Sequence, residues 1–547
     1  MAKPSEKKSL SWGRDDAFTH TLIVGPTRCG KTATILKPII YQILDSKRKG
    51  RKVGLSVIEP KGDVAAMVKE ICTWMEIDCV HIDPTIPNSD RLNVMQGDKD
   101  DVAEATVAVL KSLFGKQEAF FATVQELSTR KITLMLKELY GDNMDITDVL
   151  TNLRDPYVLE KNIHKLQEKQ GNTELVKFFT HELLGSLKDK YQQLIIGLRA
   201  QMENITSNDH LKRVITGKST FSIDEHFEIG GVLAVNTALG KLGKAGDAFG
   251  QFVAMHLQLG TFRRKGTEKT RVDHYMIIDE YSRYINPDVE RWLSISAEYR
   301  VAGMFAIQSI AQLEVEAGQL SGKAMKQAIL TSTRNKIIFG GLSSNDAKEL
   351  AQELGQDRVV YKNKLYSGNP LKSLIPKGYS IKEEDKDRFP YTLLMDGLPR
   401  FHFVHKLLQD GHPQPPGIAL GTFLPRDWKE LIIKEDVHRI SQEEQKKAKL
   451  VGQENSSSND NKNKNRRKEV VFNLKPKNDP FLDDPFEEPV EDNNKQNEKT
   501  VLSPVAVETS TEPTEDSEVD NSSKDIEEKQ KPKEPVALLK DQDDDFW

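Results

Sequence analysis

The feature that most constrains the fold is a glycine-rich loop near the amino terminus, set between an apolar strand pattern and a helical pattern. Residues 21–24 read Thr-Leu-Ile-Val and run directly into G-x-x-x-x-G-K-T at residues 25–32. The two glycines let successive backbone N–H groups turn inward, which makes a cradle for phosphate oxygens. The helix that follows points the positive end of its dipole at the same place. The sequence therefore predicts a phosphate-binding loop in an α/β fold.

The residue types in this loop predict separate roles. Lys31 is expected to reach the β- and γ-phosphates of ATP, and the hydroxyl of Thr32 is expected to bind Mg²⁺. A glycine turn before an ordinary helix is the simpler interpretation, but the strand before the loop and the helix after it favour a nucleotide site. The expected nucleotide-binding residues are Gly25, Pro26, Thr27, Arg28, Cys29, Gly30, Lys31 and Thr32.

Strand and helix patterns alternate on both sides of a long helical stretch. Apolar strands with intervening helices predict a mostly parallel sheet covered on both faces. The expected strands span residues 21–24, 52–58, 79–83, 232–236, 274–280, 303–308 and 336–340, and a late hairpin and closing turn are expected at 393–407 and 423–425. Residues 100–217 show helical periodicity without convincing strands, with helices expected at 102–114, 120–139, 175–187 and 191–205. We therefore expect an all-α domain inserted into the sheet domain.

These patterns predict five segments. They are an amino-terminal lead (1–17), the first part of a nucleotide-binding domain (18–99), the all-α inserted domain (100–217), the second part of the nucleotide-binding domain (218–433) and a disordered acidic tail (434–547). The tail is rich in Gln, Lys, Asn, Ser and Glu, so it cannot bury enough apolar area to offset the entropy of ordering.

Charge is distributed unevenly along the 547 residues. Residues 471–547 hold 22 Asp and Glu against 9 Lys, a balance of −13, so the chain's net −5 leaves +8 for residues 1–470. A basic body is compatible with a phosphate-rich partner, although an ordinary solvated surface also fits. The three cysteines show no C-x-x-C spacing and suit a reducing compartment. No signal peptide and no run near 18 apolar residues is present, so a cytoplasmic protein is expected.

Three further positions complete a predicted catalytic site. The strand at 274–278 ends in Asp279 and Glu280, and Asp279 is expected to bind the Mg²⁺ shell while Glu280 orients or deprotonates the attacking water. Gln308 ends the next strand, where open α/β sheets place residues that contact ligands. Arg300 and Arg334 are candidate arginine fingers that would act across a subunit boundary. For each arginine, a solvated helix surface is the simpler interpretation.

With these residues in view, the chain resembles the type IV secretion coupling proteins of the TraG/TraD kind, within the FtsK–HerA class of P-loop NTPases. The resemblance covers roughly residues 18–430. It rests on the loop at 25–32, on Glu59-Pro60-Lys61-Gly62-Asp63, on Asp279-Glu280 and on Gln308-Ser309-Ile310-Ala311-Gln312-Leu313. Four motifs in the expected order are far more specific than any one of them.

The resemblance implies an ATPase with a RecA/FtsK-like sheet that uses ATP and Mg²⁺. It implies a coupling protein that recruits a relaxase–DNA substrate and helps to pump it to the channel of a conjugative secretion system. The implied partners are DNA, relaxosome proteins bound through the all-α domain, a membrane subunit of the channel, and further copies of the chain in a hexamer. Family members usually begin with two membrane helices, so this chain is expected to reach the cytoplasmic face of the membrane through a partner. The interval from Arg300 to Gln308 is shorter than the family's usual spacing, which weakens the assignment of Arg300.

Two alternatives stay open from the sequence. One is a cytosolic FtsK/HerA-like DNA translocase unconnected with secretion. The other is an adaptor that acts mainly through its tail, where the similar pieces at 478–481 and 483–486 and the aromatic end at 546–547 would bind a partner.

Overall fold

A nine-stranded sheet forms the centre of the computed structural model, which describes residues 14–113, 119–185, 188–316, 321–366 and 376–435. The strand order is β13-β10-β7-β1-β6-β5-β2-β4-β3. The seven strands from β7 to β3 are mutually parallel, and β10 is antiparallel to both of its neighbours. The strands are β1 (Thr21–Val24), β2 (Val53–Glu59), β3 (Cys79–Ile82), β4 (Val232–Asn236), β5 (Asp273–Ile278), β6 (Val301–Ile307), β7 (Asn335–Phe339), β10 (His402–Lys406) and β13 (Gly417–Leu420). The mostly parallel α/β sheet expected from the sequence is confirmed.

The central strands are apolar at nearly every position because both faces of the sheet are covered. All residues of β1, β2, β4, β6 and β7 are buried. Within β1, Leu22 and Val24 belong to one apolar cluster and Ile23 to the other, as the alternation of side chains along a strand requires. The helices α2 (Lys37–Arg48) and α3 (Asp63–Trp74) cover the Ile23 face. The Leu22 face is covered by α14 (Lys244–Phe262), α15 (Val289–Ile295), α16 (Gly322–Ser332) and α17 (Ser344–Leu354).

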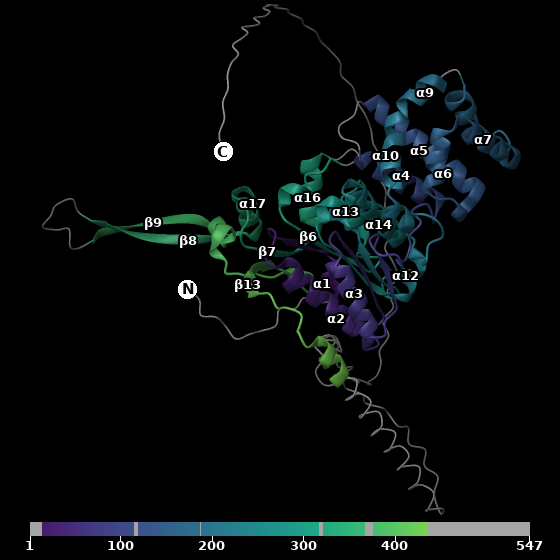
Figure 1. Cartoon of the computed structure of the whole chain (residues 1–547). Coiled ribbons are helices and arrows are strands. Elements are labelled where there is room, and N and C mark those ends of the chain that lie inside the picture. The colour runs from purple at the N-terminus through teal and green to yellow at the C-terminus, as the bar shows by residue number, and fades with distance from the viewer. Residues whose placement is uncertain (1–13, 114–118, 186–187, 317–320, 367–375, 436–547) are drawn as a thin grey trace, which may run out of the picture. The chain divides into compact units, whose positions relative to one another are not determined.

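A block of helices follows β3 in the sequence, and several of them, from α4 to α10, are labelled in Figure 1. The described residues between β3 and β4 form only helices, turns and loops. The helices are α4 (Lys99–Leu113), α5 (Ala119–Tyr140), α6 (Ile146–Arg154), α7 (Pro156–Gln170), α8 (Glu174–Phe178), α9 (Lys188–Leu194), α10 (Ile196–Thr206) and α11 (Asp209–Ile215). Helices α6 and α7 were not expected individually, and the helix expected at 191–205 is divided into α9 and α10. Asp145 and Asp155 cap α6 and α7 by accepting hydrogen bonds from backbone N–H groups, and an aspartate before a helix is a start signal that the sequence already contained.

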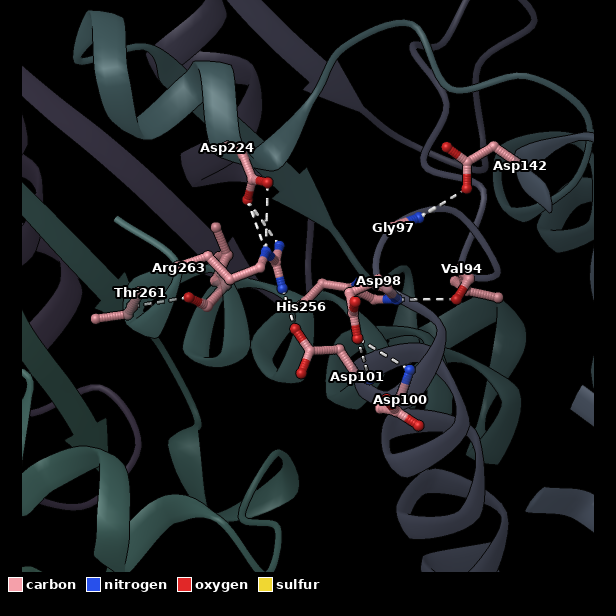
Figure 2. Close-up of polar contacts among 11 residues, drawn as sticks. Val94, Gly97, Asp98, Asp100, Asp101, Asp142, Asp224, His256, Thr261 and Arg263 are labelled. Atoms are coloured by element: carbon pink, nitrogen blue, oxygen red, sulfur yellow. Dashed lines mark hydrogen bonds and ion pairs between the residues drawn. The ribbon is translucent and has the colours of Figure 1, made fainter. Parts of the chain in front are cut away.

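One arginine ties this helical block to the sheet domain. Arg263, at the carboxyl end of α14, donates hydrogen bonds to Asp224 of α12 (Ile223–Ile229) and to Asp101 of α4 (Figure 2). Two turns earlier on α14, the His256 ring bonds the Val94 carbonyl, with Nε2 2.9 Å from the oxygen. Burial raises the pKa of Asp101, and the Arg263 guanidinium opposes that rise. The contacts of α14 thus orient the first helix of the block against the helices that cover the sheet.

The chain after β7 differs most from the expectation. A two-stranded antiparallel ribbon, β8 (Gln356–Tyr366) with β9 (Pro376–Asp387), follows α17 and was not predicted (Figure 1). The hairpin expected within residues 393–407 is not found: residues 393–397 form a π-helical turn, η7, and the strand β10 pairs instead with β13, which was not predicted. Other short elements are α1 (Arg14–Ala17), α13 (Leu239–Leu242), β11 (Leu408–Gln409), β12 (His412–Pro413), η2 (Gly141–Asn143), η3 (Phe179–Leu183), η4 (Tyr281–Arg283) and η5 (Ile310–Leu313).

The predicted disordered tail lies almost entirely outside the described residues, which end at Glu435, and most of the predicted lead precedes Arg14. None of the helices in the described part of the chain combines the length and the apolar character that a membrane crossing requires.

Candidate active site

The parallel sheet brings the predicted site residues to one edge. The carboxyl ends of β1, β6, β5 and β2 lie next to one another, with Val24 paired to Ile307, Ile278 to Phe305, and Ile58 to Ile278. The loop at 25–32 follows β1, Gln308 follows β6, and Asp279 and Glu280 follow β5. Segments that are hundreds of residues apart therefore meet at one edge of the sheet, where open α/β sheets bind ligands.

The two glycines of the loop occupy positions that a side chain could not share. Gly25 donates its N–H to the Ile307 carbonyl, and a Cβ there would lie 2.7 Å from the Cys29 sulfur and 2.8 Å from the Phe339 Cβ. Gly30 has φ +119°, a region that favours glycine. Arg28 is exposed with φ +66°, and burial raises the pKa of the Cys29 thiol. The helix begins as a π-helical turn, η1 (Lys31–Leu36), and continues as α2.

Lys31 folds back over the loop. Its ammonium donates to the carbonyl oxygens of Gly25, at 2.5 Å, and Pro26, at 3.2 Å, and only 6% of the residue is exposed. Two neutral carbonyls take two of the ammonium's three donors, and no ion pair of Lys31 with a carboxylate is present among the described residues. An anion in the cradle would supply a negative partner.

Thr32 and Asp279 bring two side-chain oxygen groups into contact. The Thr32 hydroxyl donates to the Asp279 carboxylate at 2.8 Å, and Asp279 is only 6% exposed. Burial raises the pKa of the Asp279 carboxyl above its ordinary value, and the hydrogen bond from Thr32 opposes that rise. One hydroxyl and one carboxylate fit Mg²⁺, which usually takes one or two protein oxygens together with phosphate oxygens and water. Elsewhere, the described residues hold no group of three or more His, Cys, Asp and Glu side chains suited to a metal ion.

A chain of hydrogen bonds joins the loop to the second carboxylate. The Gln308 amide donates to both oxygens of Glu280, each at 2.9 Å, and the Thr27 hydroxyl donates to the Gln308 amide oxygen at 3.2 Å. Glu280 itself has φ +54°, a conformation that costs energy for a residue other than glycine. The structure thus brings Thr27, Gln308 and Glu280 together, a connection that the separate motifs did not reveal.

The residues after Gln308 show what the Gln-Ser-x-x-Gln-Leu motif at 308–313 does to the local backbone. The Gln312 side-chain oxygen accepts from the backbone N–H groups of Gln308 and Ser309, and the Ser309 hydroxyl accepts from Ala311. This reciprocal capping starts the short helix η5, while Leu313 is fully buried. The Gln-Ser-x-x-Gln-Leu sequence therefore fixes the backbone at Gln308 and at the start of η5.

The motif at residues 59–63 also shapes the edge. Glu59 is 1% exposed, and its carboxylate accepts from the N–H groups of Lys61 and Ala65. Burial raises the pKa of Glu59, and these backbone bonds oppose the rise. Gly62 has φ +95°, and a Cβ there would lie 2.7 Å from the Asn236 amide nitrogen. This motif is a tightly packed turn beside the site.

Arg300 lies at the other edge of the sheet. It precedes β6 at its amino end, whereas Gln308 follows the strand at its carboxyl end. Its guanidinium pairs with Asp273 at 2.7 Å and Asp15 at 2.7 Å and lies 3.9 Å from the centre of the Phe18 ring. Arg334 precedes β7 at the same edge, where it donates to the Gly411 carbonyl. The structure therefore does not bring Arg300 or Arg334 to the loop within one chain.

Sequence reasoning also missed residues that lie against the loop on its other flank. The ring of Phe401 packs on Gly30: a Cβ on this glycine would lie 2.7 Å from the Phe401 Cδ1 atom. The signal available in the sequence was the strand at 402–406. Because β10 is antiparallel to β7, it starts at the edge of the sheet where β7 ends, and Phe401 directly precedes it there.

Comparisons with known proteins agree with this arrangement. Residues 273–395 match the family model described as the TraM recognition site of TraD and TraG. No curated protein sequence matches the chain. Among solved structures, the unbound bacterial conjugative coupling protein TrwBdeltaN70 is similar with a TM-score of 0.56 and 15% identity, over 75% of this chain and 86% of that chain.

Nucleotide complexes of the same plasmid coupling protein are similar to the same degree. TrwB with ADP and Mg²⁺ gives a TM-score of 0.54 and 14% identity over 77% of this chain and 91% of that chain. TrwB with a non-hydrolysable ATP analogue gives 0.55 and 14% over the same shares. The P-loop NTPase fold is confirmed, and the resemblance to the TraG/TraD kind of coupling protein is confirmed for residues 273–395.

Proposed function

We propose that this chain is the ATPase of a conjugative type IV secretion system, a coupling protein that recruits a relaxase–DNA substrate and helps to pump it to the transfer channel. The observation that carries the proposal is the joined constellation at the sheet edge. Thr32 bonds Asp279 on one strand, and Thr27 reaches Glu280 through Gln308 on the next. A structural turn would need none of these links between the loop and the carboxylates.

ATP and Mg²⁺ are the proposed substrate and metal. The inward backbone of residues 25–32 would hold the phosphates, and Lys31 would leave the carbonyls of Gly25 and Pro26 to bind the β- and γ-phosphates. Thr32 and Asp279 would hold Mg²⁺, which neutralises charge on the phosphate oxygens when it is bound. TrwB, which shares the fold, has been solved with ADP and Mg²⁺.

The chemistry proposed for Glu280 follows from its surroundings. A carboxylate that follows a buried strand beside the phosphate cradle is placed to orient a water molecule and accept its proton. In the present structure both Glu280 oxygens accept from the Gln308 amide, which holds the carboxylate in place while each oxygen keeps a lone pair that can accept a hydrogen bond from water. Because Gln308 is also hydrogen-bonded to Thr27 in the loop, a shift of Thr27 on phosphate binding would change the hydrogen bonds between Gln308 and Glu280.

The proposed partners follow from the matched segment and the charge balance. The family model matched by residues 273–395 is described as a TraM recognition site, which supports a relaxosome partner for this chain. The net +8 of residues 1–470 favours DNA, and the helical block at 99–215 is the proposed contact for relaxosome proteins. We further propose a homo-hexamer and a membrane subunit of the channel that holds the chain at the cytoplasmic face of the membrane.

The test is ATP hydrolysis by the full chain, with and without single-stranded DNA, double-stranded DNA and a relaxase–DNA complex. The wild type is expected to hydrolyse ATP and to be stimulated by DNA. Lys31→Ala and Glu280→Gln are expected to lose about a hundredfold or more in rate. Lys69→Ala, which removes an exposed lysine on α3, serves as the matched control and should hydrolyse ATP at the wild-type rate. Hydrolysis that neither DNA nor the relaxase–DNA complex changes would contradict the proposal.

A further inference from the structure

Two aromatic rings lie on the flank of the loop opposite to the carboxylates. In the strand order, β6 and then β5 lie on one side of β1, and they are followed in the sequence by Gln308 and by Asp279-Glu280. The strands β7 and then β10 lie on the other side of β1. On that second side the Phe401 ring packs against Gly30. Phe423 meets Phe401 edge to face, with ring centroids 5.0 Å apart and planes at 86°.

The fold delivers these rings to the loop by two passes of the chain. β10 is antiparallel to β7, so its first residues lie at the carboxyl edge, with Phe403 paired to Phe339. β13 returns along β10 to the same edge, where the Gly421 N–H donates to the Phe401 carbonyl at 2.9 Å. Gly421 in turn lies against Thr34 in the first turn after the loop, because a Cβ at Gly421 would be 2.3 Å from the Thr34 hydroxyl.

The exposure of the rings distinguishes them from core aromatics. Phe423 is 54% exposed, and Phe401 is half-buried. The exposed guanidinium of Arg400 lies 4.6 Å from the centre of the Phe401 ring. An exposed aromatic pair beside a cation offers stacking and cation–π contact to a flat, electron-rich ligand. Its position next to a phosphate cradle points to the flat part of a phosphorylated ligand.

We propose that Phe401, Phe423 and Arg400 form the platform on which the base of the nucleoside triphosphate lies, an inference that rests on the proposed function. The terminal phosphate belongs on the flank of Glu280 and Gln308, where the attacking water would be oriented. A triphosphate laid along residues 25–32 from that flank places its nucleoside at the other end, beside Gly30 and Thr34. The two phenylalanine rings have no hydrogen-bonding groups, so they hold the base by stacking and add affinity with little discrimination between bases.

The experiment compares two probes that differ by the nucleoside. Full-length wild type, Phe423→Ala and Tyr379→Ala are titrated calorimetrically with ATP and with inorganic tripolyphosphate, each in the presence of Mg²⁺. Phe423→Ala is expected to weaken ATP binding by roughly 5- to 100-fold, the worth of one stacked base, and to leave tripolyphosphate within about twofold. Tyr379 is a 63% exposed aromatic residue on β9, and its substitution should change neither affinity.

A second variant gives a signal that a structural role would not produce. Phe423→Trp should bind ATP as the wild type does, and its added fluorescence should be quenched by ATP and left unchanged by tripolyphosphate. The platform is overturned if Phe423→Ala binds ATP with wild-type affinity, or if it loses both probes to the same degree. A wild type that binds neither probe, or binds both regardless of Lys31→Ala, overturns the proposed function itself.

Discussion

The substitution Arg300→Ala tests whether Arg300 forms a structural ion pair or acts as an arginine finger. The guanidinium is 13% exposed, and it pairs with Asp273, which is 15% exposed, and with Asp15, which is 88% exposed. The exposed pair is worth about 0–1 kcal/mol, and the contact with the Phe18 ring adds about 0.5–2 kcal/mol. Asp273 keeps a second partner in Arg51, at 2.8 Å, so no buried carboxylate is left alone.

These contributions together predict a loss of about 0.5–3 kcal/mol in the free energy of unfolding. The ATP turnover of the folded Arg300→Ala protein should stay within about threefold of wild type, because an arginine finger is worth about 10³–10⁵ in rate and a structural ion pair is not. Thermal denaturation followed by circular dichroism measures the first quantity, and a coupled ATPase assay at a temperature where both proteins are folded measures the second. Arg334→Ala is the matched control at the same sheet edge and should lose little stability, since its side chain is exposed. A fall of a hundredfold or more in turnover with an unchanged denaturation midpoint would refute the reasoning and assign Arg300 to a neighbouring subunit's site.

Three further predictions concern the site and its supporting turns. Gln308→Leu should slow ATP turnover by about 10- to 100-fold while leaving the ATP affinity nearly unchanged, because Glu280 loses the amide that holds it; equal turnover would contradict this. Asp279→Asn should abolish the Mg²⁺ dependence of nucleotide binding and yet raise the denaturation midpoint at pH 7. Burial raises the pKa of Asp279 in the folded protein, so its ionised form costs stability above that pKa, and the gain from the substitution should vanish as the pH falls to about 4. Gly62→Ala should lower the free energy of unfolding by about 2 kcal/mol or more, because the backbone is left-handed there and the Asn236 amide lies close. Gly50→Ala, at a position with φ +94° and open space around it, should lower it by only about 1 kcal/mol. Equal losses in chemical denaturation would show that the contact with Asn236 contributes nothing to the effect at Gly62.

Much of the sheet could be predicted because its strands are buried on both faces. A strand such as Val232–Asn236 is buried throughout and apolar until its last residue, and its boundaries agree with the sequence pattern. The β8–β9 ribbon escaped prediction because its strands are mostly exposed, so their apolar and charged residues follow no burial period. Helices α6 and α7 escaped for a different reason: their start signals are single aspartates in a region where the broad helical pattern hides the breaks.

The candidate residues were also predictable one by one, but their connections were not. The loop at 25–32 and the pair Asp279-Glu280 are each recognisable from local chemistry. The register between β1 and β6, with Val24 opposite Ile307, is what sets Thr27 beside Gln308. No local pattern encodes that register, because it arises from the packing of strands that are more than 270 residues apart.

The sequence by itself determined the glycine-rich loop at 25–32, the carboxylate pair and the parallel sheet, because each depends on residue types at short spacing. Only the tertiary structure decided which residues share the site. In it, Gln308 is hydrogen-bonded to Glu280, and Phe401 with its neighbour Phe423 lies beside Gly30. Arg300 lies at the edge of the sheet opposite to the loop. The physical reason is that the direction and order of strands in a sheet fix which ends meet, and direction and order are properties of the packed chain rather than of any segment.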